Sequence, residues 1–309
     1  MTPIILATPR GFRFVTTVLS HGWCELLPFS SNEQDHILER VQLLSDGQVV
    51  KLLIGSGEAK QSLGVTVEGY NGALTNEKQA EVGRLVSRCL KLEQDLNDFY
   101  RLLRDRPRYQ WVEPIGAGRL LGAPTIWEDL VKTLLTTNTT WNVTVQMCRR
   151  LIALGDRYAS GSHCFPTPHQ IACLSLNDLT KQVRAGYRTV FLHELATAIA
   201  EGTLDVEGWG NPELTSEELY RRIRALKGFG DYAAGSMLKL LGRFDRLGID
   251  TSCREVFRVQ LNDGNKASDN EIRAYYEPFG SWRGLIMWMD VMRVSFLSRG
   301  LLHEENTDT

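Results

Sequence analysis

The sequence predicts a mostly α protein, a helical bundle in which a glycine hairpin joins two helices, preceded by an α+β N-terminal domain. Three observations indicate this class. β-Branched and aromatic runs broken by Gly, Ser and Asn turns, typical of strands, are confined to about the first hundred residues. From Trp127 onward, strand signals nearly vanish and apolar residues recur at helical spacing. In that helical half, the segment from Leu226 to Gly230 interrupts the pattern with two glycines one residue apart.

Length and composition allow two packed domains in a soluble protein. The chain has 309 residues, of which 43% are hydrophobic and 23% charged, ordinary values for a globular protein. We expect an α+β domain over 1–110, a helical domain over 111–300 and a frayed tail over 301–309. No apolar run approaches the roughly 20 residues of a membrane helix, and no secretory signal is evident. Six scattered cysteines without a C-x-x-C pair indicate reduced, mostly buried thiols in the cytoplasm.

The N-terminal domain is expected to mix strands and helices. Residues 35–44 fit either a helix or a strand. Apolar side chains at helical spacing predict helices over Asn76–Leu90 and Gln94–Leu103. The runs that predict strands are Phe12–Leu19, Trp23–Phe29, Val49–Ile54 and Leu63–Val67.

The helical domain begins with a start signal. Thr125 is an expected N-cap, with Glu128 three residues on, for a helix from Trp127 to Thr137. A polar break at residues 138–140 separates this helix from the next. The later helices are expected from residue 141 to 154, after residue 165, up to residue 200, over 271–279 and over 282–297, with a linker at 209–215.

The hairpin has the chemistry of an anion site. Gly228 and Gly230 permit a tight turn whose backbone approaches a ligand closely. The N–H groups of this turn, with the positive end of the helix that starts near Tyr232, favour an anion such as a phosphate. Asp231 is an expected N-cap of that helix. Asp250 follows Gly230 by twenty positions and is either a carboxylate that performs chemistry or the N-cap of another helix.

This pattern resembles the helix-hairpin-helix, Gly-Pro-Asp superfamily of DNA base-excision glycosylases. The family hairpin reads L-P-G-x-G, and the catalytic Asp follows it in a V-D-T-H-like segment. Lys227 replaces the usual proline and Ser252 the usual histidine. The residues that match are Leu226, Gly228, Gly230 and Ile249-Asp250-Thr251.

The resemblance implies a role for each part of this segment. Asp250 would be the catalytic carboxylate, and the hairpin would hold the DNA backbone without reading sequence. A monovalent cation at the hairpin carbonyls is a further implication, and no other cofactor or metal is expected. The hairpin residues that would bind DNA are Lys227, Gly228, Phe229 and Gly230.

The first helix of the helical domain extends the resemblance to about residues 118–297. It implies that Asn138 or Thr139 fills the hole left by an extruded base; the alternative is that they cap the helix around Trp141. No cysteine follows Cys253, so an iron–sulfur cluster of the endonuclease III type is not expected, and the 3-methyladenine DNA glycosylase II (alkylbase) branch is nearest. The family motif P-x-x-E-x-L-x-x-x-L-L-x-x-Q is similar here at Pro124, Glu128, Leu130, Leu134, Leu135 and Asn138.

Tyr232 indicates the type of reaction. Bifunctional glycosylase/lyases of this superfamily carry a lysine two residues after the second hairpin glycine, and its amine forms a Schiff base with the sugar. Tyr232 occupies that position and cannot form an imine, while Lys227 and Lys239 lie elsewhere. The resemblance therefore implies a monofunctional DNA glycosylase that uses water, has no lyase activity and excises damaged, preferentially alkylated bases in base excision repair.

Two other functions stay open: a mismatch or oxidised-base glycosylase, and a non-catalytic helix-hairpin-helix protein that binds DNA or senses damage. An enzyme of this kind takes the base out of the stack and holds it between aromatic surfaces. Packing in the core is the alternative for each aromatic residue. The expected base-pocket residues are Tyr232, Trp127, Trp141, Tyr187 and Trp288.

The expected partner is double-stranded DNA that contains a damaged base. The net charge of -2 requires a local basic face for this partner. We expect a monomer without a membrane partner, located in the cytoplasm with the nucleoid, or in the nucleus if the source is eukaryotic. Two basic clusters could supply the face: Arg101, Arg104, Arg106, Arg108 and Arg119, and then Arg221, Arg222, Arg224 and Lys227.

Overall fold

The computed structural model describes residues 3–32, 36–57 and 59–303. Its contacts divide the chain into two compact units, each built from two separate stretches. Unit 1 comprises Met1–Glu93 and Leu121–Asn211, and unit 2 comprises Gln94–Leu120 and Pro212–Thr309. This division differs from a single boundary near residue 110, because residues 121–211 pack with the N-terminal sheet. Among the described residues, no helix has the length and apolar character needed to cross a bilayer.

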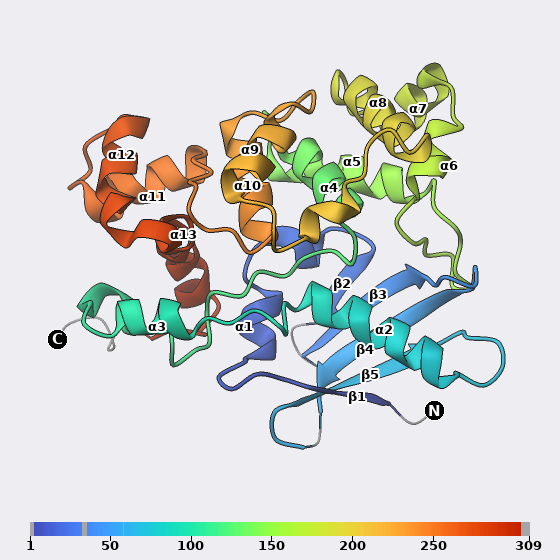
Figure 1. Cartoon of the computed structure of the whole chain (residues 1–309), viewed down its shortest axis with the longest axis horizontal. Coiled ribbons are helices and arrows are strands. Elements are labelled where there is room, and N and C mark those ends of the chain that lie inside the picture. Colours follow the sequence, from blue (N-terminus) through green and yellow to red (C-terminus); the bar gives the residue numbers. More distant parts are fainter. Residues whose placement is uncertain (1–2, 33–35, 58, 304–309) are drawn as a thin grey trace. The chain divides into compact units, whose positions relative to one another are not determined.

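The sheet of unit 1 is antiparallel throughout, in the order β1-β5-β4-β3-β2. Burial alternates along β4 and β5, so one face of the sheet is covered. Helix α2 (Asn76–Cys89) runs along the sheet and contacts β1 (Figure 1). The strands are β1 (Ile4–Ala7), β2 (Phe29–Asn32), β3 (Ile37–Leu43), β4 (Val49–Ser56) and β5 (Ser62–Glu68).

Two of the strand predictions for the N-terminal domain are wrong. The run Phe12–Leu19 contains α1 (Phe14–Val18), and Trp23–Phe29 contains the 3-10 helix η1 (Gly22–Glu25) before β2 begins. In α1, Phe14, Thr16, Thr17 and Val18 are all buried, and a short run buried on every side has no period that separates helix from strand. The strands expected over 49–54 and 63–67 are confirmed as β4 and β5, and the ambiguous segment 35–44 contains β3.

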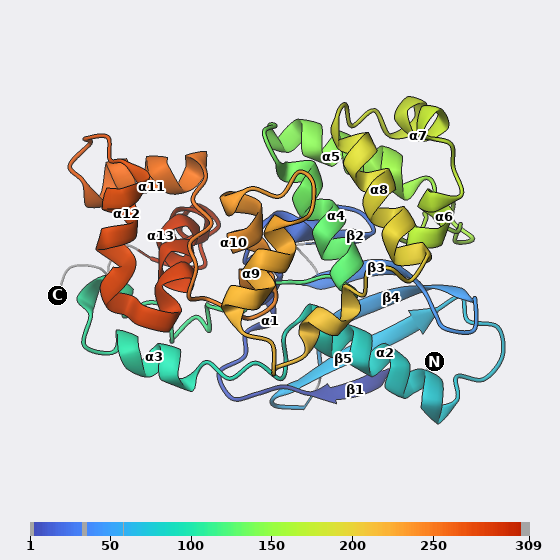
Figure 2. The same cartoon turned by 45° about the horizontal axis from the view of Figure 1, so that its top comes forward.

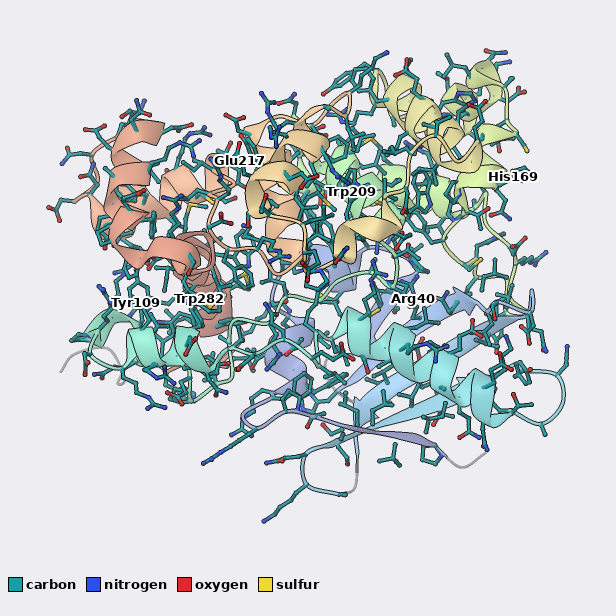
Figure 3. The ribbon with its side chains drawn as sticks, in the orientation of Figure 1. Arg40, Tyr109, His169, Trp209, Glu217 and Trp282 are labelled. Atoms are coloured by element: carbon teal, nitrogen blue, oxygen red, sulfur yellow. The ribbon has the colours of Figure 1, made fainter. Side chains whose placement is uncertain are left out.

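Helix α4 (Ile126–Thr136) is buried along most of its length, and an ion pair connects it to the sheet. Thr125 is its N-cap, as predicted, and its hydroxyl oxygen accepts from the Glu128 N–H at 3.2 Å. The Glu128 side chain turns to β3, where its carboxylate accepts from Arg40 at 2.6 Å (Arg40 is labelled in Figure 3). Lys132 lies 2.8 Å from the same carboxylate. This buried triad fixes α4 on the sheet.

Of the remaining helices of unit 1, α5 (Trp141–Ile152), α8 (Arg188–Ala200) and the 3-10 helix η3 (Glu207–Gly210) contact α4, while α6 (Pro168–Ala172) and α7 (Leu176–Val183) pack on α8 (Figure 2). Short loops with N-capping side chains separate several of them; Thr167 and Gln170 form a complete capping box at the start of α6.

Unit 2 is helical and includes α3 (Asn97–Leu103) from the earlier stretch of chain. The buried carboxylate of Asp290 accepts from Arg108 at 2.8 Å, Tyr109 at 2.9 Å and Tyr276 at 2.8 Å, which ties that stretch to the C-terminal helix. Residues 304–309 of the expected frayed tail lie outside the described residues. The other elements are η2 (Pro107–Tyr109), α9 (Ser216–Arg224), α10 (Asp231–Leu240), α11 (Thr251–Leu261), α12 (Asp269–Tyr276), η4 (Glu277–Trp282) and α13 (Arg283–Ser298).

Candidate active site

The segment between α9 and α10 forms a tight turn. The two helices lie side by side (Figure 1), and Gly228 has a φ of 86°, which side chains with a Cβ rarely adopt. Gly230 is the N-cap residue of α10, and no side-chain hydrogen bond caps this helix in the described part of the chain. The first N–H groups of α10 have no partner within the helix, so the turn presents backbone donors to an anion.

Asp231 does not cap α10, so that prediction is wrong. It occupies the first helical position, and its carboxylate turns back to α9. There it accepts from the Tyr220 hydroxyl at 2.8 Å and pairs with the Arg224 guanidinium at 3.1 Å. Arg224 also donates to the carbonyl of Phe229 in the turn. The negative charge beside the anion site is therefore paired with a cation, although both side chains are exposed.

Asp250 is the N-cap of α11. Its Oδ1 accepts from the backbone N–H of Cys253 at 2.7 Å, and no hydrogen bond to Oδ2 is found among the described residues. The side chain is half-buried. The hydrogen bond of the cap holds the orientation of the carboxylate. The capping interpretation is thus correct.

Two glycines bring the loop before Asp250 against α10. A Cβ on Gly235 would lie 2.7 Å from the Cα of Gly248, and a Cβ on Gly248 would lie 3.0 Å from the carbonyl oxygen of Tyr232. Only a residue without a side chain allows so close a backbone approach. This contact was not predicted from the sequence, where its signal is Gly235 itself, an isolated glycine inside a helical pattern.

The start of α13 holds the same loop from another side. The N–H of Gly284 donates to the carbonyl of Phe244 at 2.7 Å, and Arg283 donates to the carbonyl of Asp245 at 2.6 Å. A Cβ on Gly284 would lie 2.3 Å from the Arg246 carbonyl oxygen. Backbone contacts from α10 and α13 therefore fix the path of the chain into Asp250.

Lys239, on α10, is buried near this carboxylate. Its Nζ lies 4.2 Å from the ring centroid of Trp288, which is half-buried on α13. Burial lowers the pKa of Lys239, against the opposing influence of Cys253 and Asp250. Burial also raises the pKa of Cys253 to about 12, so that thiol is neutral. Tyr232 is half-buried in the first turn of α10.

A second group of predicted site residues lies in unit 1. Asn138 has a φ of 46°, and its side-chain amide donates to the Tyr187 hydroxyl at 3.3 Å. Arg188 donates to the carbonyls of Thr137 and Asn138, and its guanidinium lies 4.6 Å from the Tyr187 ring centroid. Tyr187 is 49% exposed. The side chain of Thr139 is half-buried. Neither Asn138 nor Thr139 caps α5, whose N-cap residue is Thr140.

Trp127 and Trp141 make packing contacts within unit 1. The Trp127 indole donates to the carbonyl of Pro166 at 2.9 Å, and the residue lines a cavity of about 470 Å³ together with Phe165 and Arg40. Trp141 donates to Glu25 at 2.6 Å, and its ring lies against Gly22. Every residue that lines this cavity belongs to unit 1. The base-pocket role of these two residues stays a prediction.

The first basic cluster is engaged in structural contacts. Arg104 pairs with Glu113, Arg108 with Asp290, and Arg119 is buried and donates to a backbone carbonyl. In the second cluster, Arg222 pairs with Glu218 and Arg224 with Asp231, while Arg221 and Lys227 are exposed. Only the second cluster adjoins the turn between α9 and α10. In the described part of the chain, no three His, Cys, Asp or Glu side chains converge as a metal site.

Comparisons with known proteins show the fold. No family model matches the chain, and no curated protein sequence does. The 3-methyladenine DNA glycosylase of Archaeoglobus fulgidus superimposes with a TM-score of 0.74 at 18% identity, over 95% of this chain and 99% of that one. The 8-oxoguanine glycosylase/lyase of Clostridium acetobutylicum gives 0.68 at 18% identity, over 94% and 96%. The chain therefore has the fold of the DNA glycosylases.

A smaller relative matches part of the chain. The 3-methyladenine DNA glycosylase Mag1 of Schizosaccharomyces pombe, solved in complex with abasic DNA, gives a TM-score of 0.52 at 20% identity. It covers 64% of this chain and 96% of its own. The first two relatives differ in the bases they are named for, so the shared fold leaves the base that this chain accepts undetermined.

Proposed function

We propose that the protein is a monofunctional DNA glycosylase that removes a damaged base by hydrolysis of the N-glycosidic bond, in base excision repair. The observation that carries this proposal is Asp250, a half-buried carboxylate that caps α11, in a loop that backbone contacts hold against α10. The helix that bears Tyr232 also starts at a glycine turn without a side-chain cap in the described part of the chain, so its positive end faces that turn. A glycosylase needs two such features. One is a fixed negative charge near the sugar, and the other is a set of backbone donors that bind a DNA phosphate.

Asp250 would act on the deoxyribose. Loss of the base develops positive charge on the sugar, and a preorganised carboxylate stabilises that charge. At about 4 Å and an effective dielectric constant near 20, the attraction is about 4 kcal/mol. This corresponds to roughly three decades in rate. The same carboxylate would orient or deprotonate the attacking water.

The turn between α9 and α10 would be the hairpin of a helix-hairpin-helix motif. Gly228 and Gly230 bring the backbone close to a DNA phosphate, and the α10 dipole favours the bound anion. The pairing of Asp231 with Arg224 supports this role, because it offsets the negative charge of Asp231 beside the proposed phosphate site. Contacts of this kind fix the position of DNA and do not read its sequence.

The group around Asn138 would enter the duplex where the base leaves. Its left-handed backbone and its hydrogen bond to the exposed Tyr187 make a polar and aromatic projection on unit 1. An aromatic ring can stack on the bases that the flipped nucleotide leaves behind. Tyr187 would then fill the gap in the stack beside Asn138, which differs from the pocket role expected from the sequence.

The side chains near the hairpin support hydrolysis without a lyase step. Tyr232 offers no amine, and Lys227 lies on the exposed turn before α10. Lys239 is an amine, but its burial on α10 keeps it from the sugar. Incubation with borohydride is the direct check, because reduction traps an imine. A covalent protein–DNA adduct would establish a lyase mechanism and exclude the monofunctional one.

The central experiment is an excision assay on duplexes that each carry one methylated, deaminated or oxidised base. We expect wild-type protein to release at least one of them and Asp250→Asn to be slower by about a thousandfold. Asp263→Asn, an exposed carboxylate in the turn after α11, is the matched control and should keep full activity. Salt-dependent DNA binding without release of any base would instead establish a non-catalytic binding or damage-sensing protein.

A further inference from the structure

The cavity of about 470 Å³ in unit 1 plays no part in the proposed glycosylase chemistry. Asp250 and the turn between α9 and α10 belong to unit 2, and none of their residues lines it. Its volume falls within the range of about 300–1,000 Å³ that is typical of sites for small molecules. The lining residues come from the end of β3, the start of α4, the loop before α6 and the segment from the end of α8 to η3.

The walls of this cavity are mainly apolar and include two aromatic rings. Trp127 and Phe165 are buried and meet edge to face, with ring centroids 6.4 Å apart. The indole N–H of Trp127 donates to the carbonyl of Pro166 at 2.9 Å, so the polar atom of this ring is already bonded. Leu204 and Val206 add aliphatic surface. Walls of this kind favour the flat, apolar body of a ring.

The buried end of the cavity carries positive charge. Arg40 is 3% exposed, and its guanidinium donates to both carboxylate oxygens of Glu128, at 3.0 and 2.6 Å. Lys132 contributes a second cation to the same carboxylate, at 2.8 Å. Two cations therefore share one carboxylate, and a positively charged group of a ligand would be repelled from this end. A neutral ring is better accommodated there.

The exposed edge of the cavity carries negative charge. Its exposed lining residues are Gly202, Asp205 and Glu207. The Glu207 carboxylate accepts from the Trp127 backbone N–H at 3.0 Å, and the Arg88 guanidinium balances its charge at 3.0 Å. The Asp205 carboxylate accepts from the backbone N–H of Gly208 at 2.9 Å, which fixes its position. Asp205 therefore supplies the negative charge that a ligand meets at this edge.

We propose that this cavity binds a small organic cation with a flat, apolar ring. The ring lies against Trp127 and Phe165, and the charged group stays at the exposed edge beside Asp205. This orientation follows from the positive charge at the buried end and the negative charge at the exposed edge. The proposal does not depend on the glycosylase function, because it concerns residues of unit 1 alone and is tested by binding.

Three probes that share one ring and differ in charge test the proposal: benzamidine, a cation, benzamide, which is neutral, and benzoate, an anion. Titrations of the full chain followed by NMR give the three affinities. We expect a Kd for benzamidine of about a millimolar, which is ordinary for a ligand of this size. Benzamide should bind about two- to fivefold more weakly, the usual contribution of an exposed ion pair, and benzoate most weakly. No binding of benzamidine, or equal binding of all three probes, overturns the proposal.

The variant Asp205→Asn removes the charge and keeps an acceptor for the Gly208 N–H. We expect it to lower the affinity for benzamidine to that for benzamide and to leave the affinity for benzamide unchanged. Glu201→Gln, an exposed carboxylate that does not line the cavity, is the matched control and should bind all three probes as wild type does. A preference for benzamidine that survives in Asp205→Asn contradicts the assigned orientation.

The variant Leu204→Trp tests the location of the site, because the larger side chain occupies part of the cavity. We expect it to abolish binding of benzamidine, while circular dichroism shows a folded chain. Benzamidine binding that persists in a folded Leu204→Trp places the probe elsewhere and overturns the site. If this variant does not fold, Asp205→Asn still decides the proposal. None of these outcomes alters the release of a base by wild-type protein, so the two proposals fail separately.

Discussion

Gly235 and Gly248 meet through their backbones, so closely that a Cβ on Gly235 would lie 2.7 Å from the Cα of Gly248. Gly235 lies in the middle of α10, and Gly248 lies two residues before Asp250. The contact therefore sets the distance between the proposed catalytic carboxylate and the helix that begins at the hairpin. Catalysis of this type loses rate steeply when a charge is displaced, so this packing detail has functional consequences.

The variant Gly235→Ala should lose both stability and excision rate. The added methyl group meets backbone atoms rather than a flexible side chain, and overpacking of this kind costs typically 1–3 kcal/mol. Thermal unfolding and single-turnover excision measure the two effects. Gly210→Ala is the control, because a Cβ there has its nearest contact at 4.0 Å. Unchanged activity in Gly235→Ala would show that the close approach does not position Asp250.

Two substitutions of Asp250 should separate its role as an N-cap from its proposed role in catalysis. Asn caps helices as well as Asp does, so Asp250→Asn should lose rate with little loss of stability. Asp250→Ala removes the cap to the Cys253 N–H and should cost about a further 1 kcal/mol of unfolding free energy. Urea unfolding and excision assays on both variants test this. Equal destabilisation of the two variants would contradict a capping contribution.

The pair of Arg224 and Asp231 should influence DNA affinity more than stability. Both side chains are exposed, so breaking the pair should change the unfolding free energy by about 1 kcal/mol or less. Arg224→Ala leaves the Asp231 charge beside the phosphate site and should weaken DNA binding severalfold. Asp231→Asn should bind DNA at least as tightly as wild type. Binding titrations at two salt concentrations provide the measurement, and tighter binding by Arg224→Ala would refute the role of the pair.

The buried triad of Arg40, Glu128 and Lys132 should make unit 1 sensitive to acid. Burial alone would raise the pKa of Glu128, but Arg40 and Lys132 outweigh it and hold this pKa below its ordinary value of 4.5. The folded state therefore gains stability from Glu128 above that value and loses it as the pH falls through the lowered pKa. Urea unfolding followed from pH 7 into this acidic range measures the loss.

The variant Arg40→Met tests the same triad at neutral pH. It leaves the Glu128 carboxylate buried with one cation fewer, and the loss of one partner from a buried pair typically costs 3–5 kcal/mol. Lys51→Met removes a half-buried ion pair with Glu39 on the neighbouring strand, which stays in contact with solvent, and is the control, expected to cost about 1 kcal/mol or less. Similar losses in the two variants would be inconsistent with a buried, structural triad.

Thiol reactivity should distinguish one cysteine from the others. Cys173 is exposed, while Cys24, Cys89, Cys148, Cys164 and Cys253 are buried. Burial raises the pKa of Cys89, Cys148 and Cys253 to about 12, so they are protonated and unreactive near neutral pH. Alkylation of the native protein, followed by mass spectrometry, should label Cys173 first and leave excision intact. Rapid labelling of Cys253 would show that the region around Asp250 opens to solvent.

The sequence by itself determined most of the helical elements, the hairpin and Asp250. The helices at 76–89, 126–136 and 231–240 carry their signals locally, in apolar spacing, capping residues and glycines. Local signals also indicated two alternative roles for Asp250, the N-cap of a helix and a carboxylate that performs chemistry. Strand and helix could not be separated for Phe14–Val18, because a run buried on all sides has no distinguishing period.

Only the tertiary structure decided the relationships between distant residues. The return of Asp231 to Tyr220 and Arg224, the backbone contact of Gly235 with Gly248, and the position of Lys239 over Trp288 each join different elements. Sequence spacing shows which face of one helix a residue occupies, but not which element covers that face. For this reason the sequence identified the hairpin and its carboxylate, and the packing of α10, α11 and α13 showed how the carboxylate is held and which charge lies beside it.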